Sequence, residues 1–394
     1  YKNKWWDGFI YLFNVNTKEI YVGLLDKLIR FCEQHNYTYE FRNNKYYGLP
    51  FEVNDMISKE GVKDYITSIS KFAPREYQVE GVYDALKHNR KLLISPTASG
   101  KSLMIYAIVR YYVEKGQNTL IVVPTTSLVE QMYKDFADYG WDVGSFCHKI
   151  YAGKERETDS QVIITTWQSI YKLPRQYFSR FNVVVGDEAH QFKSKSLVSI
   201  MTKLSDAKYR YGFTGTLDGT QTHKWVLEGL FGPSYKIIRT DELMQKGHVA
   251  TLDINILLLK HPPNKFENFE EEVQYIINHE RRNKFIKNLT FSLEGNTLIL
   301  YTLVEKHGDV LNKMLAERVG DRKLFYVHGG VDAEDREEVR HITEESQNAI
   351  ILASVGVFST GVNIRRLHNI IFASPTKSVI RVLQSLGRGL RKAD

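Results

Sequence analysis

The stretch KLLISPTASGKS, residues 91–102, joins a short apolar run to a loop that ends in glycine, lysine and serine. A run with helical spacing of apolar residues follows at 103–113. Backbone N–H groups of such a loop, together with the N-terminus of the following helix, form a cradle for phosphates. In this arrangement Lys101 reaches the β- and γ-phosphates of ATP, and the Ser102 hydroxyl binds Mg²⁺. Ser95 stands where the strict phosphate-loop pattern has glycine, so a chance turn remains the alternative for this segment taken alone.

A second signal is VVVGDEAH, residues 183–190, where an apolar strand pattern ends on two adjacent carboxylates. Open α/β sheets bind ligands at the carboxyl ends of their strands. Asp187 is suited to hold Mg²⁺ through its water shell, and Glu188 to orient and deprotonate the attacking water. Such a pair is by itself more often a helix cap or a solvated turn, but the lysine loop about ninety residues earlier favours ATP hydrolysis.

The rest of the chain from residue 72 alternates short apolar strands with longer helical stretches, which predicts α/β domains with parallel sheets. A break at Gly232 and Pro233 separates two series of strands. The first series is expected at 91–95, 119–123, 161–165, 182–186 and 209–213. The second is expected at 296–302, 323–327, 349–353 and 369–373. We therefore predict domains at 71–235 and 236–394, the latter incomplete at its C-terminal end.

Residues 1–70 differ in character, because they carry fifteen aromatic side chains and nine basic against nine acidic residues. An alternating stretch at 9–13 predicts a strand and the spacing at 22–32 predicts a helix. We expect a small α+β domain with a role in substrate recognition. Trp5 and Trp6 are candidates for stacking on unpaired bases, although most aromatics of so small a domain belong to its core.

Composition sets the broad class. Cys32 and Cys147 lie far apart and outside any CxxC spacing, which argues against a disulfide framework or a zinc site and indicates a reducing, cytoplasmic setting. No apolar run is long enough to span a membrane. The formal net charge of +7 falls entirely on residues 71–394 and suits a polyanionic partner. The chain opens on Tyr1, so we expect a fragment.

From residue 72 onward the sequence resembles superfamily 2 helicases of the DEAH-box type. The segment PREYQ at 74–78 is similar to the element upstream of the phosphate loop, PTASGKS at 96–102 to motif I, and DEAH at 187–190 to motif II. Motifs Ia, Ib and III follow as VPTTSL at 123–128, TTWQ at 165–168 and FTGT at 213–216. Motifs IV, V and VI follow at 298–302, 354–364 and 384–391. Asn363 stands where many relatives have aspartate, which puts any contact at that position in doubt.

The resemblance implies two tandem RecA-like motor domains, and it implies a role for each matching position. The catalytic residues are Lys101, Asp187, Glu188, Gln384, Arg388 and Arg391. The ATP contacts are Phe72, Arg75, Gln78, Thr97, Ala98, Ser99, Gly100, Lys101, Ser102 and Gly361, and the Mg²⁺ ligands are Ser102 and Asp187. Hydrolysis is coupled to strand movement through His190, Thr214, Gly215 and Thr216. The contacts to the nucleic-acid strand are Thr125, Thr166, Gln168, His328, Ser359 and Thr360.

Within these sets, Gln78 reads the adenine edge, while Arg388 and Arg391 reach the γ-phosphate from the second domain. Taken without the resemblance, an arginine pair is more often a solvated helix face, and a lone serine or threonine a turn or cap. The order of the motifs along the chain is what favours the functional interpretation.

The opening NKWWDGFI at 3–10 resembles the N-terminal domain of phage UvsW-type helicases, which remodel branched DNA and RNA–DNA hybrids. The leading hypothesis is an ATP-dependent DNA helicase that unwinds or branch-migrates forks, junctions or R-loops in recombination, repair and replication, acting in the host cytoplasm if it is of phage origin. One alternative is the motor segment of a restriction enzyme. The other is a nucleic-acid binding module in which ATP acts as a switch.

Overall fold

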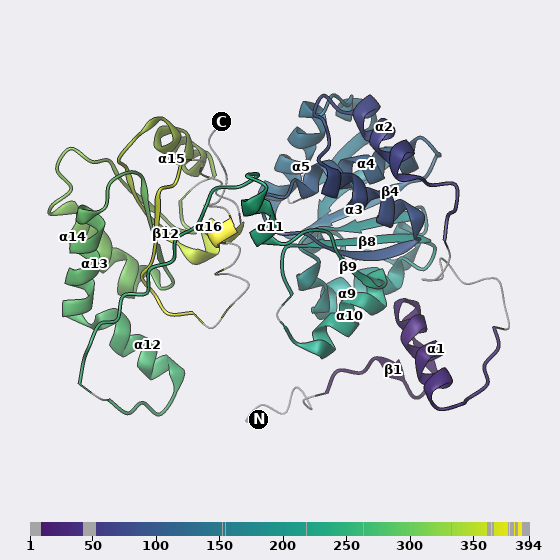
Figure 1. The fold of residues 1–394 in the computed structure, drawn as a ribbon, viewed down its shortest axis with the longest axis horizontal. Helices are drawn as coiled ribbons and strands as arrows, with labels where there is room; N and C mark the ends of the chain where they lie inside the picture. Colours follow the sequence, from purple (N-terminus) through teal and green to yellow (C-terminus); the bar gives the residue numbers. More distant parts are fainter. Residues whose placement is uncertain are drawn as a thin grey trace. The chain divides into compact units, whose positions relative to one another are not determined.

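The computed structural model describes residues 9–41, 53–151, 153, 155–217, 219–262, 264–331, 333–360, 364, 366–376, 378, 382 and 385–387. The chain divides into two compact units, Tyr1–Thr240 and Asp241–Asp394 (Figure 1). Each unit contains its own parallel β-sheet. The predicted fold class, α/β with two tandem parallel-sheet domains, is confirmed. Among the described residues, no helix has the length and apolarity needed to cross a membrane.

The first unit is built on a seven-stranded sheet in the order β5-β6-β4-β7-β8-β3-β9. Every pair in it is parallel. Its strands are β3 (Arg90–Ile94), β4 (Thr119–Val123), β5 (Cys147–Ile150), β6 (Val162–Thr166), β7 (Val183–Gly186), β8 (Tyr209–Thr214) and β9 (Ser234–Lys236). The sequence placed five of these strands to within one residue. Strands β5 and β9 were not predicted.

Helices cover both faces of this sheet (Figure 1). One face is covered by α3 (Glu76–Lys87), α4 (Lys101–Val113) and α5 (Thr126–Asp138), and α2 (Lys59–Ile69) packs on α3. The other face is covered by η2 (Ala189–Lys193), α9 (Lys195–Lys203) and α10 (Gln221–Phe231). The shorter helices of this unit are α6 (Val143–Phe146), α7 (Trp167–Ile170) and α8 (Arg175–Phe178). Helix α11 (Thr240–Gln245) begins at the last residue of this unit and continues into the second.

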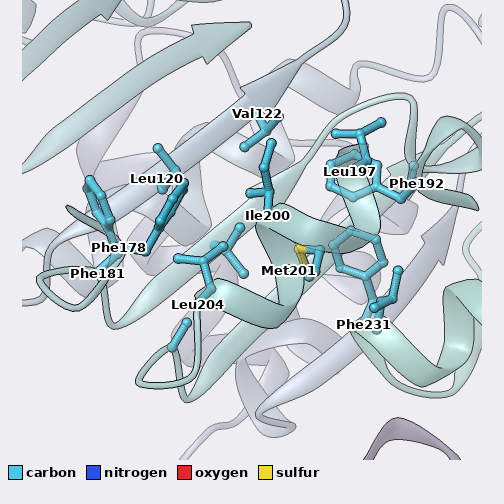
Figure 2. Close-up of a cluster of buried hydrophobic side chains, with 14 of the residues drawn as sticks. Leu120, Val122, Phe178, Phe181, Phe192, Leu197, Ile200, Met201, Leu204 and Phe231 are labelled. Atoms are coloured by element: carbon cyan, nitrogen blue, oxygen red, sulfur yellow. The ribbon is translucent and has the colours of Figure 1, made fainter. Parts of the chain in front are cut away.

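The core on the α9 and α10 side is shown in Figure 2, where the aromatic rings of Phe192 and Phe231 lie beside Leu197 and Met201. These rings pack directly on the sheet. A Cβ on Gly186 would lie 2.7 Å from the Phe192 ring and 2.8 Å from that of Phe231. Glycine at the end of β7 therefore lets the helices approach the strand that carries the two carboxylates.

The second unit has a four-stranded parallel sheet in the order β11-β12-β10-β13. Its strands are β10 (Thr297–Tyr301), β11 (Leu324–Val327), β12 (Ile350–Ser354) and β13 (Asn369–Phe372). Its helices are α12 (Phe269–Asn278), α13 (Glu280–Ser292), η3 (Val304–Gly308), α14 (Asp309–Ala316), α15 (Ala333–Glu345) and α16 (Val355–Thr360). All four strands were predicted to within one residue at each end.

The front of the chain is held on the first unit. Two short strands, β1 (Phe13–Asn14) and β2 (Glu19–Ile20), pair as an antiparallel hairpin. They are followed by η1 (Val22–Leu24) and α1 (Leu25–Gln34), so the predicted helix is confirmed. The predicted strand at 9–13 is wrong. Ile10 and Leu12 pack against the core of the first unit, so the alternation in this stretch reflects packing on that core and not sheet pairing.

This front element, residues 9–41, meets α10 through two backbone approaches. A Cβ on Gly23 would lie 2.0 Å from the Glu228 carbonyl oxygen, and one on Gly229 would lie 2.9 Å from the Tyr21 Cβ. The contact also contains a buried charge. Glu228 is 3% exposed, and its carboxylate lies 3.0 Å from Lys27 Nζ and accepts a 2.7 Å hydrogen bond from the Ser234 hydroxyl. The helix of the front element is thus fixed to the rest of the first unit by close packing and an ion pair.

We expect Lys27→Met to lower the free energy of unfolding by about 1–2 kcal/mol, because it leaves a buried carboxylate with one partner fewer. Urea denaturation at neutral pH measures the change. The matched control is Arg30→Met on the same helix, whose ion pair with Asp26 is 71% exposed on the arginine side. It should cost under about 0.5 kcal/mol. Equal losses in the two variants would contradict the buried-pair account.

The same pair predicts a pH dependence. Burial by itself raises the pKa of Glu228, but hydrogen bonds from Ser234 and Lys27 and the charges of Lys27 and Lys224 outweigh it and hold the pKa below its ordinary 4.5. A carboxylate with a depressed pKa stabilises the fold above that range and loses this contribution as the pH falls through its folded-state pKa. The stability difference between the parent and Lys27→Met should therefore narrow in the acid range below 4.5.

Candidate nucleotide site

The phosphate loop leaves the sheet at the end of β3 and re-enters regular structure at Lys101, the first residue of α4. The Ser95 N–H donates to the Thr214 carbonyl over 2.8 Å, which ties the start of the loop to the end of β8. Two residues of the loop have left-handed backbones, Ala98 with φ 66° and Gly100 with φ 76°. A Cβ on Gly100 would lie 2.2 Å from Gln78 Nε2, so this position needs glycine for space as well as for conformation.

The serine that replaces the first glycine of the strict pattern has a partner inside the loop. Ser95 Oγ lies 2.6 Å from Ser99 Oγ, and Ser99 Oγ donates to the Pro96 carbonyl over 2.6 Å. Both serines are fully buried. The departure from the pattern is thus accommodated by a hydroxyl pair that closes the loop from within.

The segment before α3 supports the loop from the other side. Tyr77 Oη donates to the Ser99 carbonyl over 2.9 Å, and Gln78 Nε2 donates to the same oxygen over 3.0 Å. Gln78 Oε1 accepts from the Arg75 N–H at 2.8 Å, and Arg75 Nη1 lies 3.0 Å from Tyr77 Oη. Burial raises the pKa of the Tyr77 hydroxyl, which keeps it protonated as a donor. Both ends of the Gln78 amide therefore engage the protein backbone, and its contact with adenine stays a prediction.

Sequence reasoning missed Tyr77, although it lies inside the PREYQ segment. It also missed Tyr139, whose hydroxyl oxygen lies 2.7 Å from Ser102 Oγ. Phe72 is 55% exposed, and its ring meets the Tyr139 ring edge to face with centroids 5.8 Å apart. No spacing in the sequence pairs residues 102 and 139, so only the fold reveals this contact.

Lys101 extends over the loop, and its Nζ donates to the Ser95 carbonyl at 3.4 Å. A Cβ on Gly215 would lie 3.7 Å from Lys101 Nζ and 3.7 Å from Thr97 N. Motif III therefore lies directly against motif I. The structure brings together Lys101, Thr97, Ser95 and Gly215 at the ends of two adjacent strands.

The two carboxylates follow β7. Asp187 is 9% exposed; its N–H donates to the Val122 carbonyl over 3.0 Å, and its Oδ1 accepts the Glu188 N–H over 2.9 Å. Glu188 has a left-handed backbone with φ 50°, unusual for a residue with a Cβ. Such strained backbone conformations cluster at functional sites, which agrees with a role for Glu188 in the chemistry.

A chain of polar contacts connects motif II with motif III. His190 Nδ1 lies 3.4 Å from Glu188 Oε2 and 3.1 Å from Thr214 Oγ1. The Thr214 hydroxyl donates its proton to the Thr216 carbonyl over 3.0 Å. Because the Thr214 hydroxyl already donates its proton, it can only accept from His190, so His190 Nδ1 carries the proton of their hydrogen bond. The other ring nitrogen, Nε2, takes no part in this contact.

The oxygen ligands expected for Mg²⁺ fit that ion in kind, since hydroxyl and carboxylate oxygens with several waters are its usual donors. Asp187 offers the carboxylate and Ser102 the hydroxyl. Bound Mg²⁺ would neutralise negative charge on the phosphates of the nucleotide.

In the first unit, the residues predicted to contact the nucleic-acid strand lie at or just after the carboxyl ends of two neighbouring β-strands, β4 and β6. Thr125 caps α5, with its Oγ1 accepting the Leu128 N–H over 3.3 Å. Thr166 Oγ1 lies 2.9 Å from Ser169 Oγ, and Gln168 Nε2 donates to the Pro124 carbonyl over 3.4 Å. The Gln168 bond joins α7, the short helix that follows β6, to the loop after β4. These residues form one polar edge, and their contact with nucleic acid stays a prediction.

In the second unit, His328 follows β11, and its Nδ1 accepts the Gly330 N–H over 3.1 Å. Ser359 and Thr360 end α16. The loop after β10 is held by His307, which lies between Ser374 Oγ at 2.8 Å and Asn283 Oδ1 at 3.3 Å. Burial and the charge of Arg282 lower the pKa of His307 to about 4, so this buried ring is neutral. The remaining predicted residues lie outside the described part of the chain: Trp5, Trp6, Gly361, Asn363, Gln384, Arg388 and Arg391.

Known proteins with related sequences divide the chain in the same way. The family described as type III restriction enzyme, res subunit, matches residues 71–219, and the helicase conserved C-terminal domain matches residues 280–393. The ATP-dependent DNA helicase uvsW of Enterobacteria phage T4 is 31% identical over 98% of this chain and 79% of its own length. The DNA 3'-5' translocase XPB2 of Sulfurisphaera tokodaii is 25% identical over 82% of this chain and 80% of its own length.

A solved structure agrees with these sequence matches. The crystal structure of T4 UvsW superimposes with a TM-score of 0.54 at 28% identity, covering 97% of this chain and 78% of that one. The chain therefore belongs to the superfamily 2 helicases, the family of the phage T4 DNA helicase uvsW.

Proposed function

We propose that this protein hydrolyses ATP to move along DNA, and that it unwinds or branch-migrates forks, junctions or R-loops. The observation that carries the motor part of the proposal is the convergence of motifs I, II and III at the carboxyl ends of β3, β7 and β8. Lys101 and Gly215 lie against each other, and Glu188 is connected to Thr214 through His190. Glu188, which we propose responds to the γ-phosphate, is thereby connected through His190 to Thr214 of motif III, which we propose moves.

The chemistry follows from these positions. The loop N–H groups and the N-terminus of α4 bind the phosphates, and Lys101 neutralises their charge. Asp187 and Ser102 hold Mg²⁺, and Glu188 orients a water and takes its proton. Loss of the γ-phosphate changes the surroundings of Glu188, and the His190 to Thr214 contact transmits this change to motif III. The resemblance of residues 384–391 to motif VI implies that Arg388 and Arg391 stabilise the leaving phosphate.

The substrate part of the proposal rests on the front element and on the T4 relative, which is an ATP-dependent DNA helicase. Phe13, Tyr37 and Tyr39 are 45%, 61% and 47% exposed. A hollow of about 1340 Å³ lies between the front element and the α9 and α10 side of the motor unit, with Tyr39, Phe13 and Arg175 in its wall. Aromatic faces beside a cation suit unpaired bases and their phosphates. Unpaired bases are what a fork or a junction presents.

A second candidate function is the motor of a restriction enzyme, because residues 71–219 match the res subunit of type III enzymes. A type ISP restriction-modification enzyme and a fragment of a type I restriction subunit also share the fold, at 15% and 17% identity, which bears on architecture alone. ATPase stimulation by single strands, duplexes, forks, four-way junctions and R-loops tests the proposal. Preference for branched substrates supports it. DNA cleavage dependent on ATP and Mg²⁺ would favour the restriction candidate.

We expect Glu188→Gln to reduce ATP turnover by roughly 10²–10⁴-fold, because the amide keeps the shape of the side chain but cannot accept a proton. The variant should retain ATP and hold DNA more tightly. Lys101→Ala is the matched control, since it should lose ATP binding as well as turnover. Nucleotide retention and DNA affinity are measured together. Normal hydrolysis by Glu188→Gln would remove Glu188 from the role of base.

Fork recognition is best tested by surface substitutions, since removing residues 1–70 would uncover the core on which Ile10, Leu12 and Tyr21 pack. Tyr37→Ala combined with Tyr39→Ala should weaken fork binding while ATPase on single strands is kept. Base stacking on an aromatic ring is worth roughly 1–3 kcal/mol, so the loss should be at least about fivefold. Phe269→Ala, at a partly exposed aromatic in the second unit, is the control. Equal losses on forks and plain duplexes would refute recognition by the front element.

A further inference from the structure

Arg282 lies in the first turn of α13 and is partly exposed. One of its terminal nitrogens, Nη1, is nevertheless buried, and it has no hydrogen-bond acceptor among the described residues. Two other arginines that are partly or fully buried are satisfied by backbone carbonyls, since the guanidinium of Arg210 donates to three and that of Arg322 to four. A buried donor without an acceptor costs free energy, so the placement of Arg282 indicates a function beyond packing.

The polar groups beside Arg282 are paired with one another. Asn283 Nδ2 donates to the Ile277 carbonyl over 2.8 Å, which directs Asn283 Oδ1 at His307 Nε2, 3.3 Å away. Because an amide oxygen only accepts, Nε2 carries the proton of this neutral ring. His307 Nδ1 then accepts from the Ser374 hydroxyl over 2.8 Å. The network is closed within these residues, and none of its bonds extends to the Arg282 guanidinium.

The same network places Arg282 at the carboxyl edge of the second sheet. Ser374 follows β13, and its Oγ accepts the N–H of Thr302, which follows β10, over 3.1 Å. Burial lowers the pKa of His307 and the charge of Arg282 adds to this effect, so the guanidinium lies close to the ring. His328, a predicted contact to the nucleic-acid strand, follows β11. Because the strands are parallel, all these residues lie at one edge, where α/β sheets bind their ligands.

The charge of Arg282 is not neutralised by the protein. Burial lowers the pKa of its guanidinium, and within the described ranges no carboxylate forms an ion pair with it. Lys284, two residues further along α13, differs in this respect, since its Nζ lies 2.6 Å from the Glu280 carboxylate. A guanidinium presents its N–H donors as a planar fork that matches the oxygens of a phosphate group. The chemistry of Arg282 therefore suits a phosphate ligand.

We propose that Arg282 binds a backbone phosphate of the DNA strand at the carboxyl edge of the second sheet. This proposal rests on the proposed movement along DNA, and it adds a contact outside the segments that resemble helicase motifs. The DNA backbone is preferred to the phosphates of ATP because Arg282 shares its edge of the sheet with His328. Contacts to phosphate hold a strand without reading its sequence, which is what a motor that moves along DNA requires.

The test is Arg282→Met, which keeps an apolar stem and removes the charge. Binding of a fluorescently labelled oligothymidine is measured over a range of KCl concentrations. Each phosphate contact to a single strand contributes about 0.7 to the slope of log K against log salt, so the slope should become shallower by about that amount. The affinity at about 0.1 M KCl should fall roughly three- to tenfold. The urea midpoint should stay unchanged or rise, because a buried donor without an acceptor is removed.

Lys284→Met is the matched control, because it removes one positive charge from the same helix at a position that does not face Arg282. It should leave the slope unchanged. Arg282→Lys keeps the charge and should keep the slope, since lysine also binds phosphate as a point charge. An equal change of slope in Lys284→Met would show a general effect of net charge and overturn the proposal.

The remaining outcomes separate the role of Arg282 from the proposed function. If the parent binds DNA with a salt-dependent affinity and Arg282→Met has the same slope, the role of Arg282 fails and the proposed function stands. Weaker binding of a fluorescent ATP analogue with an unchanged slope would assign the phosphate to the nucleotide and also overturn the proposal. A lowered urea midpoint with an unchanged slope would show that Arg282 only supports the fold. A parent that binds no DNA would overturn the proposed function itself.

Discussion

The hydrogen bond from the Ser95 N–H to the Thr214 carbonyl sets the geometry on which the nucleotide site depends. It joins the end of β3 to the end of the neighbouring strand β8 at 2.8 Å. The phosphate loop consequently starts beside motif III, and Lys101 Nζ comes to lie against Gly215. Because the two strands are parallel and fully covered by helices, neither loop can shift along the sheet without breaking the buried ladder. The sheet thus places motif I, which we propose binds phosphate, beside motif III, which we propose responds to it.

The same sheet explains how the front of the chain is connected to the motor. Helix α10 follows motif III, packs on β8, and carries Glu228 and Gly229 on its outer side. The front element contacts α10 at these two residues through Lys27, Gly23 and Tyr21. Helix α10 therefore contacts both the strand that ends in motif III and the front element, whose residues we propose meet branched DNA.

Much of the architecture followed from the sequence because parallel strands buried on both faces read as unbroken apolar runs. This is why β4 and β7 were placed within a residue. Strand β5, with sequence CHKI, and β9, with SYK, lie at the edges of the sheet with polar residues half-exposed, so their pattern resembles a loop. The error at 9–13 arose because alternation also describes a segment that lies flat on another surface.

The candidate site divides in the same way. Lys101, Asp187 and Glu188 could be proposed from the sequence because phosphate and metal chemistry demands these residue types in local motifs, and their roles stay predictions. Tyr77 and Tyr139 could not, since their roles arise from contacts made across the fold, 22 residues away in one case and 37 in the other. The role of the Ser95 hydroxyl likewise could not be predicted, because it depends on the hydrogen bond with Ser99. Residues that act within a local motif can therefore be predicted from the sequence, whereas residues that support the motif through long-range packing cannot.

The most direct test of the account is Thr214→Val, which keeps the shape of the side chain and removes the hydroxyl that receives the His190 Nδ1 proton. Thr119→Val on β4 is the control, because its buried hydroxyl has no hydrogen-bond partner among the described residues. ATP turnover and strand displacement are measured on the same fork. We expect Thr214→Val to keep ATP turnover within a few-fold of the parent. Strand displacement per ATP should fall by about tenfold or more, which corresponds to the loss of roughly 1.4 kcal/mol of coupling free energy. Unchanged displacement per ATP would contradict the proposed link between hydrolysis and motion.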